Sequence, residues 1–177
     1  ALSMIDVPDD LQLTVRQARV LGCLIEKAAT TPDAYPLTLN ALTTACNQTT
    51  NRDPIVSYTS SEVETAVLEL KALGLARVVH PGSGERATKY RHIADEGLRL
   101  ESAELAIMGV LLVRGAQTVP ELRSRTERYH GFGSVGEVES TLRGLADRTR
   151  PLVADVGRQT GQREDRWIQL IEVDAET

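Results

Sequence analysis

The chain has 177 residues, of which 41% are hydrophobic and 25% charged, a composition typical of a folded globular protein rather than a disordered one. It contains no run approaching the roughly 20 apolar residues that a bilayer-spanning helix needs and no secretory signal, so we expect a cytoplasmic protein without a membrane partner. The net charge of −5 argues against a general attraction to nucleic acid, and six aromatic residues are too few for a base-stacking surface.

Three helices are predicted in the first half of the chain, because apolar residues recur there every three or four positions. The predicted ranges are 14–29, 38–47 and 60–74. Thr14 and Thr38 suit N-caps, since a threonine hydroxyl accepts from the free amides of a first turn. Ser60 or Ser61 is expected to cap the third helix, with Ser61 and Glu64 as a capping box, and Gly74 to end it.

Two short strands are predicted next, at residues 75–80 and 89–93, on either side of a glycine-containing turn at residues 81–84. The same order then repeats. A helix capped by Ser102 runs to Arg114, a short helix follows Thr118, and a third helix starts at Ser134. A second pair of strands is expected at 152–156 and 165–171.

Three helices followed by a two-stranded hairpin are the parts of a winged-helix domain, a variant of the helix-turn-helix. We therefore predict a mainly α protein with small β-hairpin wings, an α+β chain made of two winged-helix domains in tandem. The predicted boundaries are an N-terminal tail at 1–13, a first domain at 14–94, a linker at 95–101, a second domain at 102–172 and a C-terminal tail at 173–177.

Several segments resemble the YceH-like family, a group of uncharacterised bacterial proteins. In the first half these are Pro36–Asn40, Ala45–Gln48 and Asn51–Pro54; in the second they are Leu112–Arg125, Arg128–Phe132 and Gly161–Glu164. The resemblance extends over about residues 13–171. It implies the tandem winged-helix fold and carries over no reaction.

The motifs that could carry chemistry have simpler interpretations. The glycine pattern at 131–136 lacks the preceding apolar strand that a dinucleotide site needs, so we interpret it as a loop leading into a helix. The three histidines have no metal-site spacing, and Cys23 and Cys46 fit small buried side chains. We expect no catalytic residue, no metal and no small-molecule cofactor.

The candidate contact residues form a polar loop and three basic groups. The loop candidates are Asn47, Gln48, Asn51 and Arg52, which act either as a recognition loop or as local caps and turns. The basic candidates are Arg86, Lys89 and Arg91 on the first wing, Arg123 and Arg125 in the predicted short helix after Thr118, and Arg158, Arg163 and Arg166 on the second wing. Both third helices are acidic on their expected outer faces, which disfavours direct reading of DNA by these helices.

Two functions remain open at this point. The fold favours a non-enzymatic DNA-associated or regulatory protein, an argument by analogy, in which DNA is contacted by the wings and the polar loop. The alternative is a protein-interaction or assembly scaffold, self-associating as a homodimer, that does not read DNA directly. The clustered arginines favour the first function and the acidic third helices favour the second.

Overall fold

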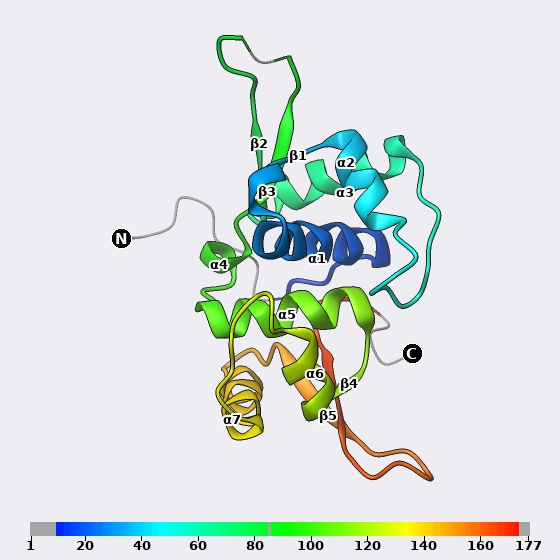
Figure 1. The fold of residues 1–177 in the computed structure, drawn as a ribbon, viewed down its shortest axis with the longest axis vertical. Coiled ribbons are helices and arrows are strands. Elements are labelled where there is room, and N and C mark those ends of the chain that lie inside the picture. The colour runs from blue at the N-terminus through cyan, green and yellow to red at the C-terminus, as the bar shows by residue number, and fades with distance from the viewer. Residues whose placement is uncertain (1–9, 85, 174–177) are drawn as a thin grey trace.

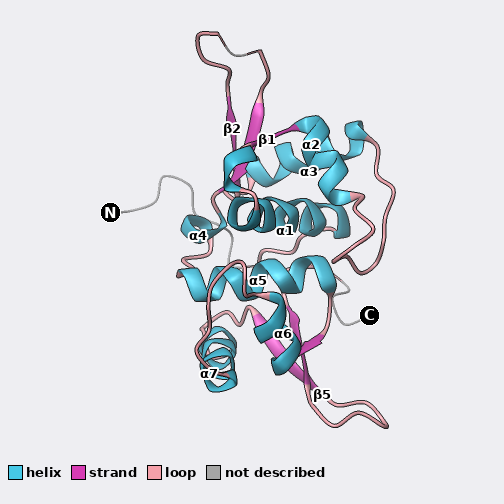
Figure 2. Cartoon of the chain, in the orientation of Figure 1, coloured by secondary structure: helices cyan, strands magenta, loops and turns pink. Residues whose placement is uncertain are grey.

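The computed structural model describes residues 10–84 and 86–173, and within them the chain is an α+β protein with seven α-helices and two small antiparallel sheets (Figure 2). The helices are α1 Val15–Thr30, α2 Leu39–Cys46, α3 Ser60–Ala72, α4 Ala94–Gly97, α5 Ser102–Arg114, α6 Val119–Arg125 and α7 Val135–Ala146, with a 3₁₀ helix at Pro32–Ala34. The strands are β1 Leu37–Thr38, β2 Ala76–Val79, β3 Lys89–His92, β4 Gln117–Thr118, β5 Val153–Gly157 and β6 Arg166–Gln169.

Most helices begin after the predicted N-cap residue, but two of the predicted N-caps are wrong. Thr14 accepts from the Gln17 amide at 3.2 Å and begins α1 as expected. The cap of α3 is Thr59 rather than Ser60 or Ser61, because the Thr59 hydroxyl accepts from the Glu62 amide at 3.1 Å. Likewise α5 is capped at Glu101 rather than Ser102, whose backbone is already helical. In both cases a serine inside the first turn resembles a cap in sequence.

Both predicted hairpins are present, and each gains a third strand that the sequence did not predict. The strand orders are β1-β3-β2 and β4-β6-β5. The added strands are only two residues long: Leu37 faces Tyr90 in the first sheet, and Gln117 faces Trp167 in the second. A strand of two residues has no alternation to detect, so its existence depends on the partner strand alone.

The two halves of the chain pack through α1 and α5, which lie side by side at the centre of the molecule (Figure 1). Glycines allow the close approach. A Cβ atom on Gly22 would lie 2.7 Å from Val113, and one on Gly109 would lie 2.6 Å from Ile25. Backbone bonds add to this contact, as the Asp53 amide donates to the Val113 carbonyl at 3.0 Å. The halves therefore share one continuous core.

The end of the predicted N-terminal tail and the predicted linker belong to this packed body, whereas residues 1–9 and 174–177 of the predicted tails lie outside the described residues. Leu11 and Leu13 are buried, and Leu13 forms a parallel bridge with Glu172 at the other end of the chain. The predicted linker begins with the single turn of α4. Arg148 fixes the residues after it by donating to the carbonyls of Leu98 and Arg99 at 2.7 and 2.9 Å.

The two hairpins extend from opposite ends of the molecule (Figure 1). We call residues 76–92 the first hairpin and residues 153–169 the second hairpin. Their loops lie far apart along the longest axis, so the basic residues of the two hairpins do not form one continuous cluster. No helix in the described part of the chain has the length and apolar content to cross a bilayer.

Candidate functional site

The polar loop between α2 and α3 is fastened to its own surroundings. The Asn47 side chain donates to the Tyr58 carbonyl at 2.8 Å and accepts from the Tyr58 amide at 2.7 Å. Gln48 donates to the Thr50 carbonyl at 2.8 Å and accepts from Lys27 at 3.1 Å. Three of these bonds satisfy backbone groups within the loop and the fourth joins Gln48 to α1, which supports the structural interpretation of both residues.

Arg52 is not a surface contact, because its side chain is 0% exposed. Its guanidinium donates to both carboxylate oxygens of Glu26, at 2.6 and 2.8 Å, and to the Ala45 carbonyl at 3.1 Å. Burial raises the pKa of Glu26, but the hydrogen bonds and charge of Arg52 outweigh this and hold the pKa below its ordinary value. Arg52 therefore leaves the set of candidate contacts.

Asn51 connects the two halves. It adopts a left-handed backbone conformation with φ of 58°, and its side-chain oxygen accepts from the guanidinium of Arg114 at 2.9 Å. Asparagine tolerates this conformation better than most residues. Of the four loop candidates, Asn51 alone reaches from the first half to the second.

The first hairpin carries its charges on one face. Arg77 lies directly opposite Arg91, and Val79 lies opposite Lys89, so these four side chains point the same way. Tyr90 on the other face is buried. The segment 76–92 has four basic side chains, adding Arg86 in the loop, and one acidic, giving a formal charge of +3.

Arg77 is a member of this group that the sequence analysis missed. The alternation of the strand could have revealed it, since Arg77 and Val79 face outward while Ala76 is buried. Arg77 forms an ion pair with Glu96, at 3.4 Å, and both side chains are more than half exposed. Such a pair contributes about 1 kcal/mol or less, so it leaves the guanidinium available.

The second hairpin is neutral, with three basic and three acidic side chains in residues 153–169. Arg158 donates to the Arg163 carbonyl at 3.0 Å and lies 3.8 Å from the Asp165 carboxylate. Arg166 donates to Gln162 and to the Ala116 carbonyl, both at 3.1 Å. The arginines of this hairpin thus mostly stabilise its own loop and its junction with β4.

The arginines of α6 also have internal partners. Arg123 donates to the Gly133 carbonyl at 3.2 Å. Arg125 donates to Gln117 at 3.0 Å and pairs with Glu121 at 3.1 Å. Among the three basic groups predicted from the sequence, the first hairpin therefore carries the largest net positive charge, +3.

The outer face of α3 is acidic, as expected: Glu64 and Glu69 are exposed, and Leu68 between them is 45% exposed. In α7, Glu137 accepts from the Gly133 amide at 2.6 Å, and Glu139 is exposed. These carboxylates would lie against phosphates if either helix entered a DNA groove.

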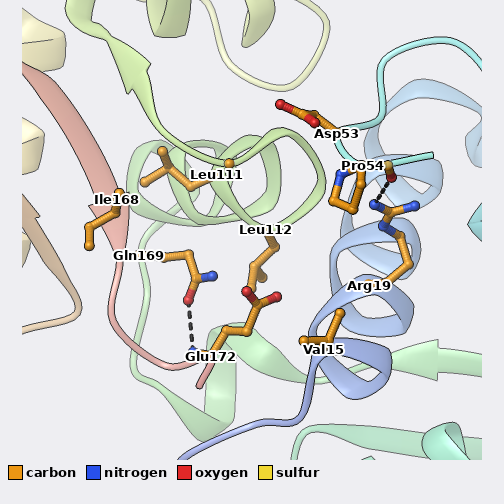
Figure 3. A pocket seen from close by; sticks show the side chains of 10 residues that line it. Val15, Arg19, Asp53, Pro54, Leu111, Leu112, Ile168, Gln169 and Glu172 are labelled. Atoms are coloured by element: carbon orange, nitrogen blue, oxygen red, sulfur yellow. Dashed lines mark hydrogen bonds between the residues drawn. The ribbon is translucent and has the colours of Figure 1, made fainter. Parts of the chain in front are cut away.

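An apolar pocket of about 210 Å³ lies between the halves (Figure 3). Val15, Pro54, Leu111 and Ile168 contribute apolar walls. The cation at its edge, Arg19, is already bonded to the carbonyls of Cys46 and Pro54. The guanidinium of Arg19 thus stabilises the loop after α2, which it joins to α1.

The histidines and cysteines form no metal site, because the described residues contain no group of three or more suitable ligands. His92 is buried, and burial lowers its pKa to about 4, so the ring is neutral near pH 7. Its Nδ1 accepts from the Ala94 amide at 3.1 Å. Cys23 and Cys46 are both free thiols and buried, as predicted.

Comparison with known proteins gives one consistent result. Residues 13–162 match the family described as "Protein of unknown function, DUF480". The chain is 50% identical to a UPF0502 protein of Geobacter sulfurreducens over 155 residues, which are 88% of this chain and 70% of that protein. It is 48% identical to a UPF0502 protein of Klebsiella pneumoniae over 171 residues, covering 94% and 78%, and 47% identical to one of Pseudomonas syringae over 161 residues, covering 91% and 70%.

Proposed function

The chain belongs to the DUF480 family of proteins of unknown function, and from its geometry we propose that it is a non-enzymatic DNA-associated regulator that contacts the phosphate backbone through its first hairpin. Each half has three helices and a small sheet with a protruding hairpin. We take each half as a winged-helix domain, with residues 14–94 as the first and 102–172 as the second. The step from this fold to DNA rests on analogy.

The single observation that carries the proposal is the pair of arginines opposite each other on the first hairpin. Arg77 and Arg91 are cross-strand partners, and Lys89 lies two residues from Arg91 on the same face. Like charges directly opposite each other destabilise a sheet. An anion placed across the ribbon reduces this repulsion, and phosphate is one of the two anions, with carboxylate, whose oxygens match the guanidinium geometry.

The electrostatics favour the hairpin over α3 as the contacting element. The hairpin segment has a formal charge of +3, whereas the outer face of α3 presents Glu64 and Glu69. Because the hairpin extends beyond the helices (Figure 1), it can approach a duplex while α3 stays further away. This binding is independent of sequence, since backbone contacts position a protein without reading bases.

The test is binding to a random-sequence DNA duplex across a salt series. We expect micromolar binding that weakens steeply with salt, and the R77Q/R91Q variant should lower the log–log salt slope by about 2, roughly 1 per lost phosphate contact. The R158Q/R163Q variant is the matched control, because it removes two charges from the second hairpin. The absence of binding at low salt, or equal losses in both variants, would overturn the proposal.

A second candidate function is a protein-interaction scaffold. Leu68, 45% exposed between two exposed glutamates on α3, favours it. An apolar side chain with acidic neighbours suits a protein surface with basic residues around an apolar centre. The mass of the protein in solution, recorded beside the DNA titration, separates the two functions: a stable dimer without DNA binding supports the scaffold.

A further inference from the structure

A polar pocket of about 330 Å³ lies between the two halves, close to the ends of three helices. Four cationic side chains line it: Lys27 from α1, Arg114 from α5, Arg125 from α6 and Arg128 just after α6. Its acidic lining residue is Glu26. This concentration of positive charge stands in a protein whose net charge is −5.

The carboxylate of Glu26 is already neutralised. Arg52 donates to both of its oxygens, and the Lys27 ammonium lies 3.3 Å from one of them. Arg125 is paired with Glu121 at 3.1 Å. Arg114 and Arg128, by contrast, donate to neutral groups, the Asn51 amide oxygen and the Thr30 carbonyl, each at 2.9 Å.

Helix ends account for part of this charge. Lys27, Arg114 and Arg125 each lie in the last turn of their helix, where the carbonyl ends carry about half a negative charge per helix. Three such ends offset about 1.5 positive charges. With Arg125 assigned to Glu121, three cations remain, so the pocket keeps an excess of positive charge. Burial and the nearby charge of Arg125 lower the pKa of Arg114, which agrees with the dense positive charge around it.

We propose that this pocket binds a small oxyanion-bearing ligand, a phosphate ester or a polycarboxylate, held between the two halves by Lys27, Arg114 and Arg128. Guanidinium groups match the oxygens of phosphate and carboxylate alike, and a lysine adds a point charge. Tyr129 also lines the pocket, and burial raises the pKa of its hydroxyl, so this group stays protonated and uncharged. The volume is at the lower end for small-molecule sites, which suits one or two anionic groups on a small body.

This inference does not depend on DNA binding, because the pocket and the first hairpin share no residue. It extends the protein's partners to a small molecule that joins residues from both halves. A ligand bound only by the folded protein raises the unfolding temperature, so stability reports its binding directly.

The test is thermal unfolding with diphosphate or citrate, at constant ionic strength set by sodium chloride, followed by calorimetric titration. We expect a saturable rise in unfolding temperature with at least one anion. K27Q and R128Q should each weaken binding roughly tenfold or more, since a charge-assisted contact is lost. R123Q is the matched control, because Arg123 is an exposed arginine of α6 outside the pocket lining, and it should bind as the unchanged protein does.

The outcomes are distinct. A saturable response to diphosphate alone identifies a phosphate ligand, and a saturable response to citrate alone identifies a polycarboxylate. Either outcome supports the proposal. A response that never saturates, or that R123Q weakens as much as R128Q, would overturn it. Unfolding of each variant without ligand shows whether it is folded, and K27Q provides a second reading if R128Q is not.

Discussion

Arg52 and Glu26 form a two-pronged ion pair inside the protein, with nitrogen–oxygen distances of 2.6 and 2.8 Å. Arg52 lies in the loop after α2, whereas Glu26 lies in α1, so the ion pair holds the loop against the central helix. Asn51, beside Arg52, reaches Arg114 of the second half. The ion pair therefore supports both the loop and the junction between the halves.

Removing one member of this pair should destabilise the protein strongly. In R52M, the buried Glu26 carboxylate loses both hydrogen bonds from Arg52 and keeps only the Lys27 ammonium, 3.3 Å away, and breaking a buried pair costs about 3–5 kcal/mol. The double variant E26Q/R52M should recover part of that loss, because no buried charge is left alone. Urea unfolding monitored by circular dichroism measures both; a loss below about 1 kcal/mol in R52M would indicate a pair that acts as if it were on the surface.

The same pair predicts a dependence of stability on pH. Because the folded pKa of Glu26 lies below its ordinary value of 4.5, its stabilising effect is complete above that value. The effect is lost as the pH falls through the lower, folded pKa. The stability difference between the wild-type protein and E26Q should therefore be largest near neutral pH and shrink on acidification below about 4.5.

R52M should weaken this dependence of stability on pH. Without the guanidinium, burial still raises the pKa of Glu26 and only Lys27 lowers it, so the folded pKa should lie above its value in the wild-type protein. Acidification should therefore cost R52M less stability relative to E26Q/R52M than it costs the wild-type protein relative to E26Q. Unfolding curves between pH 7 and pH 3 test this, and equal losses in the two comparisons would contradict the assignment of the lowered pKa to Arg52.

The sequence predicted the elements well where one residue decides a local structure. Thr14 and Thr38 cap helices, Gly74 has a φ of 82° at the end of α3, and Gly115 has a φ of 75° after α5. Thr59 was missed because the following serines have the same chemistry, and the choice between them depends on which residue leaves the helical conformation. Local chemistry therefore predicts that a helix begins in this segment, whereas the backbone conformation of Thr59 decides at which residue it begins.

The candidate site was harder to predict because exposure is a property of the whole fold. In the sequence, Arg52 is one polar residue of a loop. The Glu26 carboxylate that pairs with it inside the protein is 26 positions away in the chain. The first hairpin shows the reverse case, since Arg77 is one arginine of a strand until the register places it opposite Arg91. No pattern within one segment reveals either relationship.

The two hydrogen bonds between the Asn47 side chain and the Tyr58 backbone stabilise the loop. Their loss should therefore lower the stability of the protein without changing its binding to DNA. N47D keeps the acceptor for the Tyr58 amide, but its carboxylate cannot donate to the Tyr58 carbonyl and lies against it instead. We expect a loss of about 1–3 kcal/mol in urea unfolding, with T49A, at an exposed neighbouring position, nearly unchanged. The salt slope for DNA should not differ from the wild-type slope; a reduced slope would return the loop to the set of contacts.

Two replacements of glycine by alanine, one in α7 and one in α5, should change the stability of the protein in opposite directions. Replacing a helical glycine with alanine usually stabilises by up to about 1 kcal/mol, and G144A in α7 should do so because its Cβ would meet nothing within 4 Å. G109A should instead destabilise by about 1–3 kcal/mol, because its Cβ would lie 2.6 Å from Ile25 Cγ2 in the tightly packed contact between the halves. Thermal and urea unfolding of the two variants measure the contrast. If G109A were as stable as G144A, the helices could separate without cost, and the two halves would not behave as one body.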